Sequence, residues 1–319
     1  MKTSRLDFLS FTFEGHDKIF FTRQALSYSK NSMLVHCNFS GIFADIKPDY
    51  VDFPSNISYS YPKNKRFLFL FPVFALYYMV IYRIVLNLRL CIKYRPRVCW
   101  TNCPWASFAF GIARKFGWCE TSIYYSGDWV VLEKWGGVFR TLYLNGLWGW
   151  ADYLAAKWSD LVVNFCEEIS KARTRHWGKQ LAKREATENT LPLEVHPKAP
   201  RKNGNHILFL GHVREDSGFE IMFSLLPDLY HKFGIKLKIA GVPAGPANWH
   251  RQFIENQIKL LKLEDYVELH GWVKLENLNE VTEGCFCGMN LLTTSGTYSA
   301  YGTPGKISHY LQMLLPVLA

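Results

Sequence analysis

Short apolar runs alternate with amphipathic segments along the chain, and the same alternation recurs in both halves. The apolar runs at 6–13 and 33–37 predict buried strands, and helical spacing at 19–29 predicts a helix between them. Residues 14–17, which include a glycine, form the turn after the first strand. A strand, a glycine turn, a helix and a second strand in this order are typical of the start of a nucleotide-binding α/β domain.

The rest of the first half continues this pattern. Helices are predicted at 106–116, 142–158 and 167–177, and strands are predicted to start at 95–102 and to occupy 121–125 and 160–164. A polar, charged stretch that contains three prolines fills 179–203 and indicates a linker. We therefore expect an N-terminal domain over 1–200 and a second domain over 204–319.

The second half repeats strand and helix in turn. Strands are predicted at 206–210, 236–240, 267–269 and 289–292, and helices at 219–233 and 249–263. Residues 302–319 predict a glycine-rich turn, a short helix that Pro316 ends, and the start of an apolar strand. Two domains of this kind place a ligand in the cleft between them.

The most apolar segment, 67–82, spans about 16 residues and contains a proline, so it is shorter than the roughly 20 residues that cross a bilayer. Basic residues follow it, beginning with Arg83. Two interpretations have equal weight: a helix on an anionic membrane surface, or a helix buried against the sheet with its basic end in solvent. A membrane-spanning helix ranks third.

Composition narrows the function class. The 319 residues are 49% hydrophobic and carry a formal net charge of +10, which indicates a folded protein with an anionic partner. The positive charge is not accompanied by a recognition motif for nucleic acid, so we do not expect nucleic acid to be a partner. The eight cysteines lack metal-ligand spacing, and we expect reduced thiols and no metal. The N-terminus lacks the apolar core of a signal peptide, which predicts a cytoplasmic protein.

Three places offer candidate chemistry. Gly15 and His16 follow the first strand, where such domains bind ligands, although His16 is more commonly an ordinary turn residue. Asp128 stands at the tip of the strand at 121–125, as a functional carboxylate or a helix cap. Lys306 lies at the start of the helix after Gly302. A lysine at a helix start can bind a phosphate, but the segment is equally well explained as an ordinary connection between a loop and a helix.

At this point the chain resembles the family 4 glycosyltransferases, which are retaining enzymes. The second domain is similar to their donor-binding half in the loop 211–218, the Gly271-Trp272 turn and the region 302–319. The first domain resembles the acceptor half more loosely, in the Gly15 loop, 95–98, 126–128 and 160–163. The resemblance implies an α/β fold of two facing Rossmann-like domains (GT-B), with the second domain incomplete at its C-terminus because the family pattern continues beyond Ala319.

The resemblance also implies donor-site positions. The loop that starts at Gly211 binds the donor diphosphate in the family, with an Arg at the position of His212 and a Lys at that of Ser217; Arg214 is a candidate replacement. Tyr301 and His309 occupy the positions of two glutamates that bracket the donor sugar. The implied donor-side set is Gly211, His212, Arg214, Ser217, Gly271, Trp272, Tyr301, Gly302, Lys306 and His309.

The function implied is transfer of a sugar from a nucleotide-sugar to a glycan acceptor, expected to be lipid-linked, in polysaccharide or lipopolysaccharide synthesis. No cofactor beyond the donor is expected. Asp128 or His16 would orient or deprotonate the acceptor hydroxyl. The basic, aromatic first domain suits the inner face of the plasma membrane. Two alternatives stay open: an inactive, membrane-binding remnant of such an enzyme, and a GT-B nucleotide-sugar epimerase.

Overall fold

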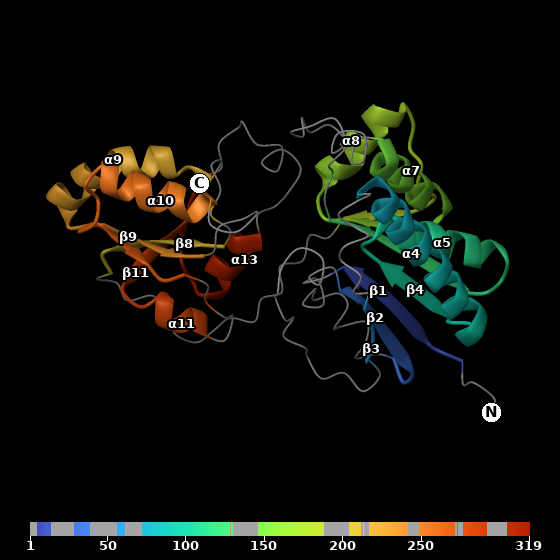
Figure 1. Ribbon diagram of the computed structural model, residues 1–319. Helices are drawn as coiled ribbons and strands as arrows, with labels where there is room; N and C mark the ends of the chain where they lie inside the picture. The colour runs from blue at the N-terminus through green and yellow to red at the C-terminus, as the bar shows by residue number, and fades with distance from the viewer. Residues whose placement is uncertain are drawn as a thin grey trace. The chain divides into compact units, whose positions relative to one another are not determined.

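The chain divides into two compact units, Met1–Asn189 and Thr190–Ala319, each built on its own sheet (Figure 1). The computed structural model describes residues 5–13, 29–38, 56–60, 72–127, 129, 146–187, 204–211, 213, 217–241, 249–271, 273, 277–291 and 305–319. We refer to the two parts as unit 1 and unit 2 and describe each by itself.

Unit 1 contains a seven-stranded sheet in the order β3-β2-β1-β4-β5-β6-β7. Its strands are β1 (Phe8–Phe13), β2 (Ser32–Asn38), β3 (Asn56–Ser60), β4 (Val98–Thr101), β5 (Thr121–Ser126), β6 (Leu161–Asn164) and β7 (Glu185–Thr187). Every pairing is parallel. The chain builds outward in both directions from β1 and β4, so the topological switch point lies between these two strands.

Helices α4 (Pro72–Tyr94), α5 (Pro104–Lys115), α7 (Gly149–Trp158) and α8 (Glu167–Trp177) belong to this unit. The first three pack side by side in Figure 1. Helix α5 begins with Pro104 at its first position, where a missing N–H costs no hydrogen bond. Gly111 of α5 lies against Trp158, and a Cβ at this glycine would come within 2.7 Å of the Trp158 Cβ. The close approach lets α5 sit centrally between its neighbours.

Helix α4 packs one face on the core of unit 1. Val80, Leu86 and Leu90 are buried in the same cluster as Leu9 and Phe11 of β1. Over 80–94, the packing of α4 corresponds to the interpretation of a helix buried against the sheet. That interpretation placed Arg83 in a basic run exposed to solvent, and this part is wrong, because Arg83 is only 1% exposed. Within the described parts of the chain, no helix is both long and apolar enough to span a bilayer.

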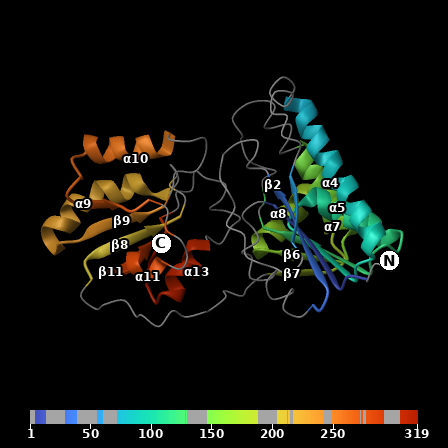
Figure 2. The same cartoon turned by 60° about the horizontal axis from the view of Figure 1, so that its bottom comes forward.

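Unit 2 contains a five-stranded parallel sheet in the order β10-β9-β8-β11-β12. Its strands are β8 (His206–Leu210), β9 (Lys236–Ala240), β10 (Val267–Leu269), β11 (Cys285–Met289) and β12 (Val317–Leu318). Its helices are α9 (Phe219–Phe233), α10 (Trp249–Leu260), α11 (Leu278–Val281) and α13 (Gly305–Gln312). Figures 1 and 2 show α9 and α10 on one face of the sheet and α11 and α13 on the other. The switch point of this sheet lies between β8 and β11.

The C-terminal strand β12 pairs with β11, as Gly288 with Val317 and Met289 with Leu318. The Gly288 amide donates to the Pro316 carbonyl at 2.8 Å. Gly288 also makes room for Tyr310, because a Cβ at position 288 would overlap the Tyr310 ring. The short strand at the end of the sequence is therefore part of the sheet.

The predicted fold class, α/β with two parallel sheets, is confirmed. The strand predicted at 289–292 is wrong, because β11 occupies Cys285–Met289 and the buried Cys285 and Cys287 act as its core side chains. The linker predicted at 179–203 is wrong at its start, where β7 (Glu185–Thr187) extends the sheet beside β6. Strand β3 was not predicted.

Candidate functional site

The switch point of unit 2 is occupied by the side chain of Tyr310, which is fully buried. Its hydroxyl accepts a hydrogen bond from the Leu210 amide at 2.8 Å and donates one to the Met289 carbonyl at 3.0 Å. Leu210 ends β8 and Met289 ends β11, so one hydroxyl joins the carboxyl ends of the two central strands to helix α13. Burial raises the pKa of Tyr310, which keeps the donating proton in place.

Lys306 precedes Tyr310 by four residues and therefore lies one turn earlier on the same face of α13. Its ammonium lies 4.3 Å from the ring centroid of Phe209, the last but one residue of β8. Phe209 in turn packs against Phe219, the first residue of α9, with ring centroids 4.7 Å apart. These contacts place the Lys306 charge close to where β8 ends and α9 begins.

The connection from β8 to α9 depends on glycines. Gly211 and Gly218 have φ values of +102° and +75°, a region that other residues rarely adopt. A Cβ at Gly218 would overlap the carbonyl oxygen of Leu291, and a Cβ at Gly241 would overlap that of Gly211. Gly218 caps α9 without a side-chain hydrogen bond to its first turn. Gly218 itself offers no side chain to the first amides of α9, and amides at a helix start suit an anion.

Three other predicted donor-side residues of unit 2 are described: Ser217, His309 and Gly271. Ser217 is 1% exposed, so its side chain packs inside unit 2 and does not replace a lysine that reaches a diphosphate. The Nδ1 atom of the half-buried His309 lies 3.2 Å from Oε1 of Gln312, on the turn of α13 after Lys306. Gly271, with φ +67°, follows β10 at the same end of the sheet, with β9 between it and β8.

Gly211, Ser217, Gly271, Lys306 and His309 all lie in unit 2, either directly after a strand of its sheet or at the start of α9 or on α13. The remaining predicted site residues fall outside the described part of the chain: Gly15, His16, Asp128, His212, Arg214, Trp272, Tyr301 and Gly302. Their assigned roles stay predictions.

Asn290 is a polar residue at this end of the sheet that sequence reasoning did not identify. It follows β11 directly, is 8% exposed, and its amide donates to the Leu318 carbonyl at 2.8 Å. Its side-chain oxygen has no hydrogen-bond partner among the described residues. A buried acceptor without a partner is costly, and a ligand hydroxyl or N–H would satisfy it. The only signal in the sequence was an asparagine at the end of an apolar run.

Unit 1 carries a buried polar network at the carboxyl ends of β5 and β6. Arg173 of α8 donates to both carboxylate oxygens of Asp152, at 2.8 and 3.1 Å, and Tyr124 donates to the same carboxylate at 2.7 Å. Arg173 also donates to Asn164 at 2.8 Å and to Ser126 at 2.6 Å. Burial and the Asp152 charge raise the pKa of Tyr124.

The network fixes the residues on both sides of Asp128. Ser126, two residues before it, accepts from Arg173, and Trp129, one residue after it, is 3% exposed and lies 5.8 Å from the Arg173 guanidinium. The Trp129 ring also meets His176 of α8 edge-on at 5.8 Å. Helix α8 thus contacts both Ser126 and Trp129. Among the described residues, no group of His, Cys, Asp and Glu is arranged to hold a metal ion.

No protein-family model matches this chain, and no curated protein matches it in sequence. Solved structures match it in fold. Anabaena HepE, solved with UDP and glucose, has a TM-score of 0.64 at 15% identity over 98% of this chain and 80% of HepE. Sucrose-phosphate synthase from Thermosynechococcus elongatus has a TM-score of 0.59 at 13% identity, over 98% of this chain and 80% of the synthase.

The lipopolysaccharide outer core galactosyltransferase WaaB, in its apo form, has a TM-score of 0.55 at 11% identity, over 97% of this chain and 79% of WaaB. Likeness at these identities concerns the fold. The chain has the two-sheet α/β fold of GT-B glycosyltransferases.

Proposed function

We propose that this protein is a retaining glycosyltransferase that moves a sugar from a nucleotide-sugar donor to a glycan acceptor. The observation that carries the proposal is the position of Lys306, beside the switch point of unit 2 and near an α9 N-terminus without a side-chain cap. A lysine near the amides of a helix start is an arrangement that binds phosphate groups. HepE, which shares the fold, was solved with UDP and with UDP-glucose, and this supports the same class of donor.

In the proposed donor complex, the diphosphate contacts the first amides of α9 and the ammonium of Lys306. Arg214 and His212, in the loop after Gly211, would add further contacts. The nucleoside would lie toward Asn290, whose unpaired oxygen accepts a hydrogen bond, and His309 takes the position of a ribose-binding carboxylate. The remaining donor-side candidates are Gly271, Trp272, Tyr301 and Gly302.

In the transfer step, the bond from the anomeric carbon to the diphosphate oxygen breaks, and the acceptor oxygen bonds to the same carbon. The negative charge that develops on the diphosphate is stabilised by Lys306, Arg214 and the α9 amides. The acceptor hydroxyl loses its proton, and we assign Asp128 or His16 to orient that hydroxyl or accept the proton. Arg173 is a positioning residue for Asp128, through Ser126 and Trp129.

We further propose a lipid-linked acceptor in cell-surface polysaccharide or lipopolysaccharide synthesis, with the protein at the cytoplasmic face of the plasma membrane. Helix α4 supports this, since Ile81, Val85 and Ile92 are 56%, 39% and 46% exposed. Arg89 and Lys93 are exposed on the same side of the helix. Apolar and cationic side chains on one helix face suit an anionic lipid surface.

Thermal denaturation with UDP, GDP, dTDP and CMP tests the donor site. One nucleotide should raise the melting temperature, and Lys306→Ala should remove the shift, because ligand that binds only the native state stabilises it. Lys232→Ala, an exposed lysine in the last turn of α9, is the matched control and should keep the shift. No shift with any nucleotide, in a chain that still unfolds cooperatively, would favour a binding remnant without transferase activity.

The stereochemical outcome needs a separate measurement. With a donor of α configuration such as UDP-glucose, slow transfer to water releases free glucose, and proton NMR at early times reads its anomeric form. Release of α-glucose supports retention. Release of β-glucose first would contradict the retaining assignment while leaving the donor site intact.

A further inference from the structure

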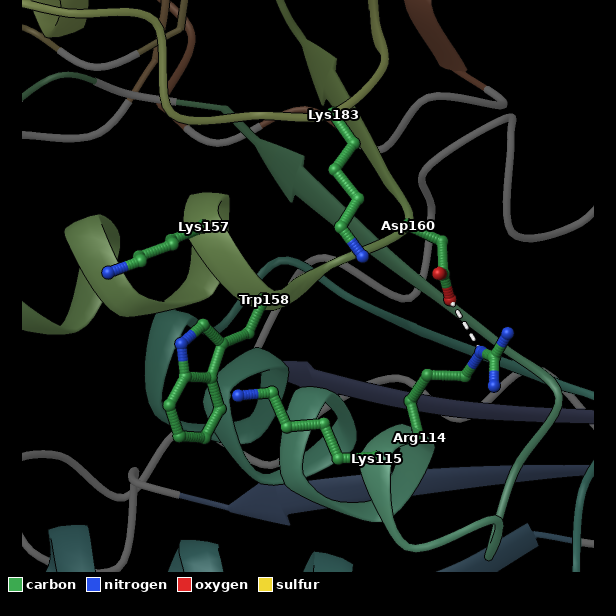
Figure 3. A pocket seen from close by; sticks show the side chains of 6 residues that line it. All are labelled: Arg114, Lys115, Lys157, Trp158, Asp160 and Lys183. Carbon is green, nitrogen blue, oxygen red and sulfur yellow. Dashed lines mark hydrogen bonds and ion pairs between the residues drawn. The ribbon is translucent and has the colours of Figure 1, made fainter.

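A basic hollow lies at the end of the unit 1 sheet opposite to the Arg173 network. Six residues line it: Arg114, Lys115, Lys157, Trp158, Asp160 and Lys183 (Figure 3). They come from the last turns of α5 and α7 and from the residues just before β6 and β7. Because all strands of this sheet are parallel, these positions mark its amino edge, whereas Ser126 and Asn164 mark its carboxyl edge.

Positive charge dominates the hollow, with four cationic side chains and one carboxylate, a formal excess of three positive charges. Figure 3 shows the end of Lys183 directed to the space between Trp158 and Asp160, while the Arg114 guanidinium lies beside the Asp160 carboxylate, with which it pairs. The Lys115 ammonium lies over the Trp158 ring, 3.6 Å from its centroid, and Lys157 extends on the other side of this ring. An aromatic face fixes a cation in this way without neutralising it.

The single carboxylate of the hollow pairs with Arg114, which leaves the three lysines as the excess positive charge. Asp160 accepts from Arg114 Nε at 3.2 Å and from the Ser122 amide at 3.0 Å. Among the described residues, no carboxylate lies within ion-pair distance of Lys115, Lys157 or Lys183. Lys157 lies over the Tyr153 ring, 5.5 Å from its centroid, so the lysines that face the hollow are Lys115 and Lys183. An anion between these two lysines would relieve their mutual repulsion.

We infer that this hollow is a binding site for a phosphate-bearing anion. Lysine side chains directed at one space are common donors to phosphate oxygens. The hollow has a volume of about 380 Å³. One water occupies about 30 Å³, so there is room for an organic group attached to the phosphate. Trp158 offers that group an apolar face.

Two sources carry this chemistry, a phospholipid head group and a soluble phosphate compound. Phe116, next to Lys115, is 66% exposed and stacks on Trp118 with ring centroids 5.0 Å apart. Arg95, after the end of α4, donates to the Gly117 carbonyl at 3.2 Å and holds this turn. Exposed aromatic rings beside cations are typical of contacts with a lipid interface, so Phe116 can distinguish the sources.

Binding is measured on the full chain by calorimetry with inorganic phosphate, pyrophosphate and glycerol 3-phosphate at low ionic strength. Cosedimentation uses phosphatidylcholine vesicles with and without phosphatidylglycerol. The test variant is Lys115→Gln/Lys183→Gln, and the control is Lys232→Gln in unit 2. All measurements are repeated with Lys306→Ala, because the proposed donor site would also take a phosphate.

In the Lys306→Ala background, which removes the donor-site contribution, we expect the double variant to weaken binding roughly tenfold or more and Lys232→Gln to leave it unchanged. Binding to phosphatidylglycerol vesicles that also weakens in Phe116→Ala identifies a lipid source. Binding of soluble phosphates that does not respond to Phe116→Ala identifies a soluble ligand. No binding of any probe, or equal binding by the double variant, overturns the inference. The inference does not rest on transferase activity, since loss of nucleotide binding in Lys306→Ala leaves this site untouched.

Discussion

The guanidinium of Arg173 lies 2.8 Å from the carboxylate of Asp152, and the two side chains are 1% and 2% exposed. This ion pair joins α8 to α7 and, through Ser126 and Asn164, to the carboxyl ends of two strands. A charge pair so deep in unit 1 requires both partners, because the hydrogen bonds of each offset the cost of removing the other from water.

Arg173→Leu should destabilise unit 1 by about 3–5 kcal/mol, since it leaves the Asp152 charge buried without a partner. Urea unfolding, monitored by hydrogen exchange, measures the stability of each unit separately. Lys171→Ala is the control, because its pairs with Glu167 and Glu168 are exposed and screened by solvent, and it should leave stability nearly unchanged.

Removing both charges tests whether the unpaired charge of Asp152 causes the loss of stability. Arg173→Leu/Asp152→Leu should recover much of the lost stability, as replacing both members of a buried pair by apolar residues usually does. If the double variant were as unstable as Arg173→Leu, the loss would come from the contacts with Ser126 and Asn164.

Tyr310→Phe should cost unit 2 about 1–3 kcal/mol, because the variant leaves the Leu210 amide and the Met289 carbonyl unpaired at the switch point. It should also weaken nucleotide binding, since α13 carries Lys306. Tyr230→Phe in α9 is the control, because the Tyr230 hydroxyl has no hydrogen-bond partner among the residues that the structure describes, and equal stability of the two variants would contradict the bridging role. Thermal denaturation with and without nucleotide provides both readouts.

Gly218→Ala and Gly234→Ala form a matched pair, with φ values of +75° and +69°. An alanine at either position costs roughly 1–2 kcal/mol for the left-handed backbone. Only at Gly218 would the new methyl group overlap the Leu291 carbonyl, while Gly234 has nothing within 4 Å. We expect Gly218→Ala to be clearly less stable in urea and to bind nucleotide more weakly. Equal losses would show that the β8–α9 connection relaxes freely.

Glu268 should give unit 2 an acid-sensitive contribution to stability. Partial burial would raise its pKa, but the hydrogen bonds from His206 at 3.0 Å and His270 at 3.5 Å outweigh burial and lower it from the usual 4.5. A lowered carboxyl pKa stabilises the fold above pH 4.5, and this contribution is lost as the pH falls through the lowered value. Glu268 is 41% exposed, so the contribution is at most about 1 kcal/mol.

Hydrogen exchange of the β8 and β10 amides measures this contribution between about pH 3 and pH 6, a range that brackets the usual carboxyl pKa. Glu268→Gln should flatten the pH dependence, and Glu264→Gln, an exposed glutamate outside the cluster, should not. An unchanged slope in Glu268→Gln would show that the two histidines do not stabilise the carboxylate.

Parts of the fold could be predicted to the residue, and the reason is local. Strand β8, helix α9 and strand β9 have the predicted bounds, because glycines flank each apolar run and fix where it ends. Strands β3 and β7 were missed, since both lie at the edges of the unit 1 sheet and carry serine, asparagine, glutamate or threonine. Their strand state depends on the neighbour that they pair with, which composition does not reveal.

In the candidate site, too, residues with a local sequence pattern could be predicted and residues that depend on distant contacts could not. Lys306 could be identified because a glycine turn and a lysine at a helix start form a local pattern. Tyr310 appeared only as a core position of that helix, since its two hydrogen bonds reach residues 100 and 21 positions away. Arg173 lies 47 positions from Ser126, and their pairing has no local signature in the sequence.

The contact between Gly288 and the ring of Tyr310 has a consequence for remote control of the nucleotide site. A methyl group at position 288 would lie inside the volume that the ring occupies, so the ring would have to leave the switch point. Both of its hydrogen bonds would then break, and α13 would lose its fixed orientation. The missing side chain at position 288 of β11 thereby keeps the Tyr310 ring in place and, through α13, the position of Lys306.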